Sequence, residues 1–317
     1  LPKIFDVNDG FWDKRITEAL SVNGKYFYVN TYNSPFTSGP AIFYNIKLFE
    51  NAGLKSPQDY LDEGNWTYET LKKVAKDCVE AGYKGAIMEP MHIAEQMNST
   101  LIKYDPSKGT FTGNVTDTGF VDALKYVSSG LEEGLFYNDR TDAFGRGGIG
   151  MTMMGTFGML KMGAFVKMLP SEIGVVPLPT SFEGKKLTHA PCAMRGYGIC
   201  RGAKNIEGAY YLLRYFLDLD KFEPAGANIF ANKKLEKYYR EVHLVNYKRN
   251  NLCIEYYVNP LDAVSATWAA PQGRWSRAKQ ASSNQVLVEL KKMTNVVNNA
   301  VNWANQKIKD CEKQLKG

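Results

Sequence analysis

The chain has 317 residues, of which 44% are hydrophobic and 23% charged, and its formal net charge is +6. A single hydrophobic core seldom grows past roughly 250–300 residues, so this length predicts two lobes. The lysines are densest in helix-like segments, where they form solvated faces, and this pattern argues against a nucleic-acid-binding protein. No run reaches the ~18 consecutive apolar residues of a membrane-spanning helix.

Strands and helices are expected to alternate along the chain. The first two strands are separated by a loop rich in Asn, Ser, Pro and Gly. β-branched and aromatic residues cluster between turn formers at 25–29, 41–44, 149–153, 173–176 and 197–200, which predicts strands there. This alternation with helices predicts an α/β fold with a parallel or mixed sheet.

The clearest helix begins at the N-cap candidate Thr67 and ends at Gly82. Another amphipathic helix is expected over 121–131. A third covers 206–219 and carries the apolar side chains Tyr211, Leu212, Tyr215 and Phe216. The last helical pattern covers 284–315, with a break expected near 294–299.

Residues 144–160 read FGRGGIGMTMMGTFGML, and the six residues from Gly145 to Gly150 fit the spacing GxGxxG. A dinucleotide-binding fingerprint must follow a strand and open a helix. Here the strand comes after the glycines, so the stretch is predicted to be a glycine-rich approach to a buried strand.

Motifs of catalysis and metal binding are scarce. The three histidines, His92, His189 and His243, have no HExxH or similar context, and the five cysteines include no CxxC pair. A bridge between Cys192 and Cys200 stays open. Three tyrosine pairs could ligate ferric iron as phenolates, although packing explains them better; they are Tyr210-Tyr211, Tyr238-Tyr239 and Tyr256-Tyr257.

Several stretches carry a resemblance to a known family when they are taken in order. Residues 22–29 read VNGKYFYV and residues 42–54 read IFYNIKLFENAGL. Four more segments follow: NWTYETL at 65–71, the glycine-rich stretch, IGVVPLP at 173–179, and a strand and helix start at 196–209. Together they resemble the extracellular solute-binding protein family 1 of ABC transporters, which is maltose-binding-protein-like.

The resemblance implies a two-lobed periplasmic-binding-protein type II fold with a hinge. Residues 1–38 and 199–262 would form the N-terminal lobe, and residues 39–198 and 263–317 the C-terminal lobe. Family members begin with a further N-terminal segment, so the N-terminal lobe is expected to be incomplete.

The function that the resemblance implies is binding rather than catalysis, with no metal and no cofactor. A carbohydrate, expected to be an oligosaccharide, would be captured in the interlobe cleft by hinge closure and passed to the permease subunits of an ABC importer. The protein would be a bacterial monomer outside the cytoplasm, as a cell-surface lipoprotein or in the periplasm. Two alternatives stay open: a ferric-ion or other small-solute binder of this fold, and a cleft glycoside hydrolase, which would need two facing carboxylates.

The resemblance also implies which side chains line the cleft. Aromatic faces would cover the apolar surface of a sugar ring, and polar side chains would satisfy its hydroxyls. Phe157 matches the family's stacking aromatic after the strand at 149–153. The full set of expected ligand-binding residues is Phe36, Ser38, Glu89, His92, Phe157, Gln272, Arg274 and Trp275.

Overall fold

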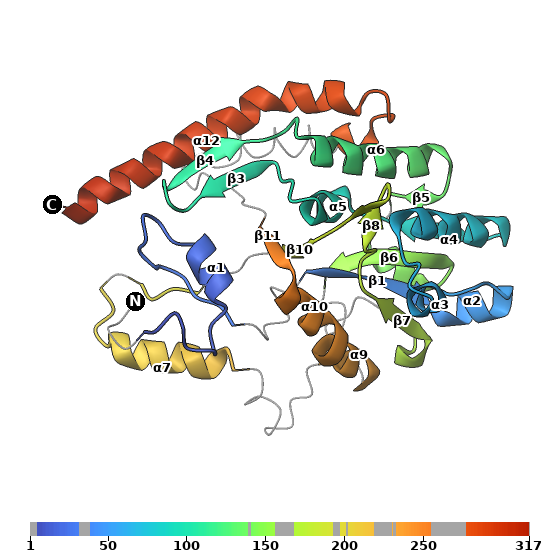
Figure 1. The fold of residues 1–317 in the computed structure, drawn as a ribbon, viewed down its shortest axis with the longest axis horizontal. Coiled ribbons are helices and arrows are strands. Elements are labelled where there is room, and N and C mark those ends of the chain that lie inside the picture. Colours follow the sequence, from blue (N-terminus) through green and yellow to red (C-terminus); the bar gives the residue numbers. More distant parts are fainter. Residues whose placement is uncertain are drawn as a thin grey trace.

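The computed structural model describes residues 5–31, 39–138, 141–155, 168–192, 197–200, 202–218, 230, 233–254 and 277–316. A five-stranded mixed sheet lies at the centre of its larger part (Figure 1). The strand order is β5-β2-β6-β1-β7, in which β5, β2 and β6 are parallel and β1 runs antiparallel to both neighbours. These strands are β1 (Pro40–Asn45), β2 (Lys84–Ile87), β5 (Phe136–Tyr137), β6 (Ile149–Gly155) and β7 (Ile173–Val176). The predicted α/β class is confirmed.

Both faces of this sheet are buried, because successive side chains of a strand point to opposite faces. In β1, Ile42 and Tyr44 join the main hydrophobic core, whereas Ala41 and Phe43 join a second core on the other face. Every residue of β1 is buried. The uninterrupted apolar character of this strand therefore follows from helices that cover both sides of the sheet.

Different helices cover the two faces. The main core packs against α4 (Tyr68–Glu80), α5 (Pro90–Gln96), α6 (Thr118–Glu132) and α12 (Val286–Lys316). The second core packs against α9 (Lys233–Tyr238), the π-helical turn η4 (Tyr239–His243) and α10 (Leu244–Arg249). Helix α4 begins as predicted, since the side chain of Thr67 accepts a hydrogen bond from the backbone N–H of Thr70.

The remaining elements are short. Two antiparallel ribbons and one parallel pair supplement the main sheet. The strands are β3 (Ile102–Asp105), β4 (Thr110–Gly113), β8 (Ser181–Phe182), β9 (Lys185–Lys186), β10 (His189–Cys192) and β11 (Asn251–Ile254). The helices and 3-10 turns are α1 (Lys14–Ala19), α2 (Ile46–Ala52), α3 (Pro57–Asp62), α7 (Ile206–Phe216), η1 (Thr141–Arg146) and η3 (Pro170–Glu172).

A third, aromatic core lies apart from the sheet and is built around α7 and the residues that precede α1. Its buried members are Trp12, Val29, Tyr210 and Leu217. Figure 1 shows α7 at the lower left, away from the five-stranded sheet, whereas Ile16 of α1 joins the second core. Residues 233–254, which the sequence assigns to the same lobe as α7, pack on the second face of the sheet. The lobe boundaries as a whole stay a prediction.

Two predicted strands form only single bridges. Within 25–29, Val29 is bridged to Tyr197, and Lys25 is bridged to Val22 in a tight turn. Tyr197 is likewise the one bridged residue of the described segment 197–200. Aromatic composition alone does not make a strand, because a strand also needs a neighbouring ladder of hydrogen bonds.

The predicted break in the last helix is wrong, since α12 runs without interruption from Val286 to Lys316. The asparagines at 295–299 cost only a few tenths of a kcal/mol each in helix propensity. Apolar side chains meanwhile continue through this region at helical spacing and pack into the main core; they are Leu290, Met293, Val297, Val301 and Ala304. Packing therefore outweighs propensity here.

Helix α7 has the predicted position, but its expected apolar face is not buried. Tyr211, Leu212, Tyr215 and Phe216 are 56–68% exposed. Tyr210, one position earlier, is 3% exposed and packs into the aromatic core. The helix is apolar nearly all round, so periodicity could not determine which side turns inward.

The glycine-rich stretch behaves as expected, because the 3-10 turn η1 precedes the glycines and β6 follows them. A Cβ at Gly150 would lie 2.6 Å from the Sγ atom of Cys78 in α4. Glycine therefore allows the close approach of strand and helix. Within the described segments, every helix is either too short or too polar to cross a membrane.

Candidate functional site

Two predicted binding segments border described residues at the edge of the sheet where β2 and β6 end. Pro40, at the start of β1, pairs with Gly155, at the end of β6. The described residues that border segments 32–38 and 156–167 therefore lie at one edge. In open α/β sheets, ligands bind outside the carboxyl ends of the strands. Six predicted residues lie outside the described part of the chain and stay predictions: Phe36, Ser38, Phe157, Gln272, Arg274 and Trp275.

Glu89 and His92 are described, and both follow β2 at this edge. Glu89 is the residue before α5, where its side chain caps no backbone N–H group. Its Oε2 atom lies 3.5 Å from the Nζ atom of Lys279, whereas its Oε1 atom is enclosed and has no hydrogen-bond partner in the part of the chain that the structure describes. The Nδ1 atom of His92 lies 2.9 Å from Oε2 of Glu95, which is 2% exposed. Whether Glu89 and His92 touch a ligand stays a prediction.

A cavity of about 380 Å³ opens at the same edge, beside the start of β1 and the end of β7. Prolines and leucines supply apolar walls, and amide and imidazole groups supply hydrogen-bonding atoms between them. The lining includes Pro40, Leu61, Gln96, Pro177, Leu178, Pro179, Thr180, Lys186, Leu187, His189, Pro191, His243, Asn246, Tyr247 and Asn250, of which Lys186 is exposed and carries a charge. Sequence reasoning missed this cavity, because its walls come from segments far apart in the chain.

Close backbone approach and a buried amide shape one wall of the cavity. A Cβ at Gly39 would lie 2.0 Å from the carbonyl oxygen of Pro191, so glycine is required where β10 crosses the sheet edge. Gln96, at the end of α5, accepts a 2.6 Å hydrogen bond from the Tyr68 hydroxyl. Its amide donates to the carbonyl of Pro179 at 3.1 Å. Both ends of the Gln96 amide are thus held by the protein.

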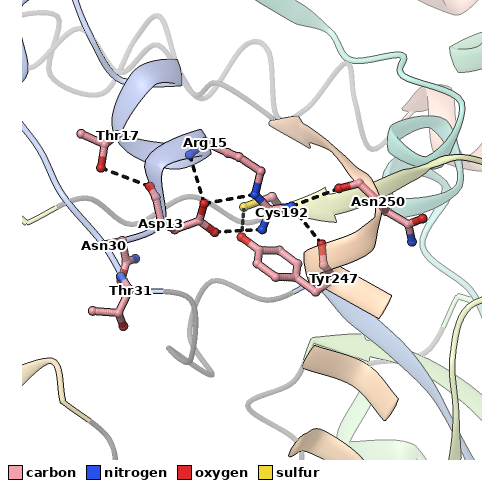
Figure 2. Close-up of polar contacts among 8 residues, drawn as sticks. All are labelled: Asp13, Arg15, Thr17, Asn30, Thr31, Cys192, Tyr247 and Asn250. Carbon is pink, nitrogen blue, oxygen red and sulfur yellow. Dashed lines mark hydrogen bonds and ion pairs between the residues drawn. The ribbon is translucent and has the colours of Figure 1, made fainter. Parts of the chain in front are cut away.

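The opposite wall is tied to α1 by an arginine (Figure 2). Arg15 donates from Nε and Nη2 to the two carboxylate oxygens of Asp13, at 3.1 and 3.0 Å. Its Nη1 atom donates to the carbonyl oxygens of Tyr247 and Asn250, both at 3.0 Å. These carbonyls lie at the C-terminal end of α10, where the helix leaves its acceptors unsatisfied. Arg15 therefore caps a helix that lines the cavity.

Asp13 holds Arg15 from a fully buried position. Its side chain is 0% exposed and also accepts from the backbone N–H of Arg15, as the N-cap of α1. Asp13 is anchored in turn, since its backbone N–H donates to the carbonyl of Asn30 at 2.7 Å and its carbonyl accepts from the Thr17 hydroxyl. The pair connects the chain before 32–38 to α10.

Burial favours the uncharged forms of four titratable groups in and beside the cavity, namely two histidines, a thiol and a phenol. Desolvation lowers the pKa of His243 to about 4 and also lowers the pKa of His189. Desolvation raises the pKa of the Cys192 thiol to about 12, and raises the pKa of the Tyr247 hydroxyl well above its usual range. Cys192 and Tyr247 touch through Sγ and the hydroxyl, 3.5 Å apart. A thiol with so high a pKa is a poor nucleophile.

The structure bears on the possible disulfide between Cys192 and Cys200 and on the tyrosine pairs that could ligate ferric iron. Cys192 is buried, Cys200 is exposed, and neither forms a disulfide. Tyr210 is buried and Tyr211 is 60% exposed, so the two phenols of this pair do not share an environment. Tyr256-Tyr257 lies outside the described residues. In the described ranges, His, Cys, Asp and Glu side chains form no cluster of three suited to a metal ion.

Comparisons with known proteins agree with this architecture. A family model described as bacterial extracellular solute-binding protein matches residues 2–218. No curated protein matches the chain. Many solved structures share its fold, at low sequence identity.

Three of these structures illustrate the similarity. The cyclic alpha-maltosyl-1,6-maltose binding protein from Arthrobacter globiformis is 12% identical, with a TM-score of 0.56 over 96% of this chain and 78% of its own. The galacto-N-biose-/lacto-N-biose I-binding protein from Bifidobacterium longum is 15% identical, with a TM-score of 0.61 over 93% and 75%. An extracellular solute-binding protein from Staphylococcus aureus, solved with maltose, is 15% identical, with a TM-score of 0.57 over 98% and 78%. At these identities the likeness supports the two-lobed fold.

Proposed function

Since the chain belongs to the bacterial extracellular solute-binding protein family, we propose that it captures a sugar at the edge of the five-stranded sheet and delivers it to an ABC importer. The observation that carries the proposal is the 380 Å³ cavity, which combines apolar walls with amide, imidazole and hydroxyl groups and one lysine. The solved structures of this fold that bind maltose and lacto-N-biose support the choice of a carbohydrate.

The chemistry of the cavity suits a neutral, hydroxyl-rich solute. Proline and leucine side chains can cover the C–H surface of a sugar ring, while imidazole, amide and carbonyl groups can pair with its hydroxyls. Lys186 is the charged lysine of the described lining and is exposed, whereas the ion pairs Asp13–Arg15, Glu95–His92 and Glu89–Lys279 lie outside that lining. The ammonium group of a lysine can donate hydrogen bonds to the hydroxyls of a neutral sugar.

The remaining parts of the proposal follow the family. Hinge bending would close the lobes over the sugar, and the closed form would be recognised by permease subunits in the membrane. The protein would act as a monomer outside the cytoplasm, either attached to the cell surface as a lipoprotein or free in a periplasm.

A thermal-shift screen tests the proposal. A ligand at 100 times its Kd stabilises the folded state by about 2.7 kcal/mol, which raises Tm measurably. The screen uses maltose, lacto-N-biose, D-mannitol and ferric citrate, each against the whole 317-residue chain. A Tm increase with a sugar supports the proposal. An increase with ferric citrate alone would favour an iron-binding protein instead.

A further inference from the structure

A π-helical turn, η4 (Tyr239–His243), interrupts the helical segment between α9 and α10. Turns of this kind are rare in proteins and occur often at functional sites, because they reorient the side chains that follow. The last residue of this turn is His243, which the sequence presents as an isolated histidine with no motif around it. The position of His243 at the end of this π-helical turn makes it a candidate functional residue.

The imidazole of His243 is held firmly but lacks one hydrogen bond. The residue is 7% exposed, and its ring stacks on Tyr239 with centroids 5.8 Å apart and planes at 20°. Its Nε2 atom is enclosed and has no hydrogen-bond partner among the described residues. Buried polar atoms in native proteins nearly always have a partner, so an orphaned nitrogen calls for an explanation.

His243 lies on the wall of the cavity together with the polar residues that follow it on α10. Asn246, Tyr247 and Asn250 also line the cavity, and they follow His243 at spacings of three, four and seven. Residues at these spacings share one side of a helix. The side of α10 that faces the cavity is therefore a polar stripe that begins at His243 and ends where Arg15 caps the helix.

We infer that His243 is a ligand-contacting residue: its imidazole turns toward the cavity when the solute binds, so that the enclosed Nε2 atom hydrogen-bonds a hydroxyl of the solute. The inference rests on the proposed function, because it places the solute in the cavity described above. A neutral imidazole can accept from a hydroxyl at one nitrogen and donate from the other, and it suits an uncharged solute in either tautomer.

Calorimetric titration of matched variants tests this contact. The probes are maltose, lacto-N-biose and D-mannitol, and the proteins are the wild type, H243F and H243Q. Loss of one hydrogen bond to the solute should weaken binding by H243F about tenfold. H243Q, which keeps an amide donor and acceptor, should retain part of the affinity.

Tyr238→Phe is the matched control. Within the described segments, the hydroxyl of Tyr238 is also enclosed and without a hydrogen-bond partner, but Tyr238 is not among the residues that line the cavity. Its removal should leave the affinity unchanged. Equal affinities for wild type and H243F would overturn the inference and leave the sugar function intact, whereas no binding of any sugar by the wild type would overturn both.

The wild-type protein supplies a second readout that does not depend on the folding of a variant. With ¹⁵N-labelled histidine, the Nε2 resonance of His243 should move when the sugar saturates the protein. A resonance that stays in place, together with full affinity in H243F, would assign the missing partner to an ordered water and contradict the inference.

Discussion

His243 makes the stability of the folded protein depend on pH. Burial lowers the pKa of its imidazole to about 4, from an ordinary value of 6.5. Between these values the unfolded chain binds a proton that the folded protein does not, so the free energy of unfolding decreases as the pH falls through this window. The shift corresponds to about 3 kcal/mol.

Urea unfolding at pH 7 and pH 4 checks this expectation in the wild type and in H243F. The loss of stability on acidification should be smaller by about 3 kcal/mol in the variant, because phenylalanine has no proton to bind. The same pH dependence in both proteins would show that His243 is not buried in its neutral form.

Arg15 is the residue whose removal should destabilise the site most directly. In R15M the buried carboxylate of Asp13 loses its bidentate partner, and the carbonyls of Tyr247 and Asn250 lose their donor. Breaking a buried ion pair from one side costs about 3 kcal/mol or more. Chemical denaturation measures this loss.

Lys14 supplies the control for R15M. Its side chain is 46% exposed and forms an i,i+4 ion pair with Glu18, which contributes at most about 0.5 kcal/mol. K14M should therefore resemble the wild type. A similar loss in the free energy of unfolding in R15M and K14M would mean that the hydrogen bonds from Arg15 to α10 contribute little to stability.

At the scale of the element, α12 is anchored to the β3–β4 ribbon through Asn305. The side chain of Asn305 accepts from the backbone N–H of Phe111 at 2.7 Å and donates to its carbonyl at 2.9 Å. Asn305→Ala leaves both backbone groups without these partners, and we expect a loss of about 2 kcal/mol in the free energy of unfolding. The exposed Asn302 of the same helix is the control. Asn302→Ala should change stability by less than about 0.5 kcal/mol, and an equal loss in both variants would contradict the anchoring role.

Helix α7 offers a test of which side chains face the core. Leu212 is 68% exposed, so L212E should change the free energy of unfolding by less than about 0.5 kcal/mol. Tyr210 packs against Phe5 and Trp12, and Y210A should cost about 3 kcal/mol. Equilibrium denaturation compares the two variants. A large loss in L212E would show that the apolar face of α7 is covered in solution.

Whether an element could be predicted depended on how strongly its residues constrain it locally. Helix α4 was predictable because Thr67 marks its start and Leu71, Val74 and Cys78 repeat on one face. The side of α7 that faces the core could not be predicted, because apolar residues surround most of that helix. The strand predicted at 25–29 failed because a ladder needs a partner that local sequence does not reveal.

At the scale of the whole molecule, the family and the two-lobed fold could be predicted, because ordered motifs extend along most of the chain. The cavity could not be predicted from the sequence. Its walls combine residues near 40, 96, 178, 190 and 245, which only the folded chain brings together. Polar residues at 243, 246 and 250 do repeat at helical spacing, and this was the one local signal that sequence reasoning missed.

The central claim is that one sugar binds at the edge of the five-stranded sheet. Isothermal titration calorimetry of the 317-residue chain with maltose and lacto-N-biose tests it most directly, because this method measures stoichiometry and Kd together. The account predicts saturable binding of at least one of the two sugars, with one site per chain. Absence of binding by both sugars, with saturable binding of ferric citrate, would contradict it.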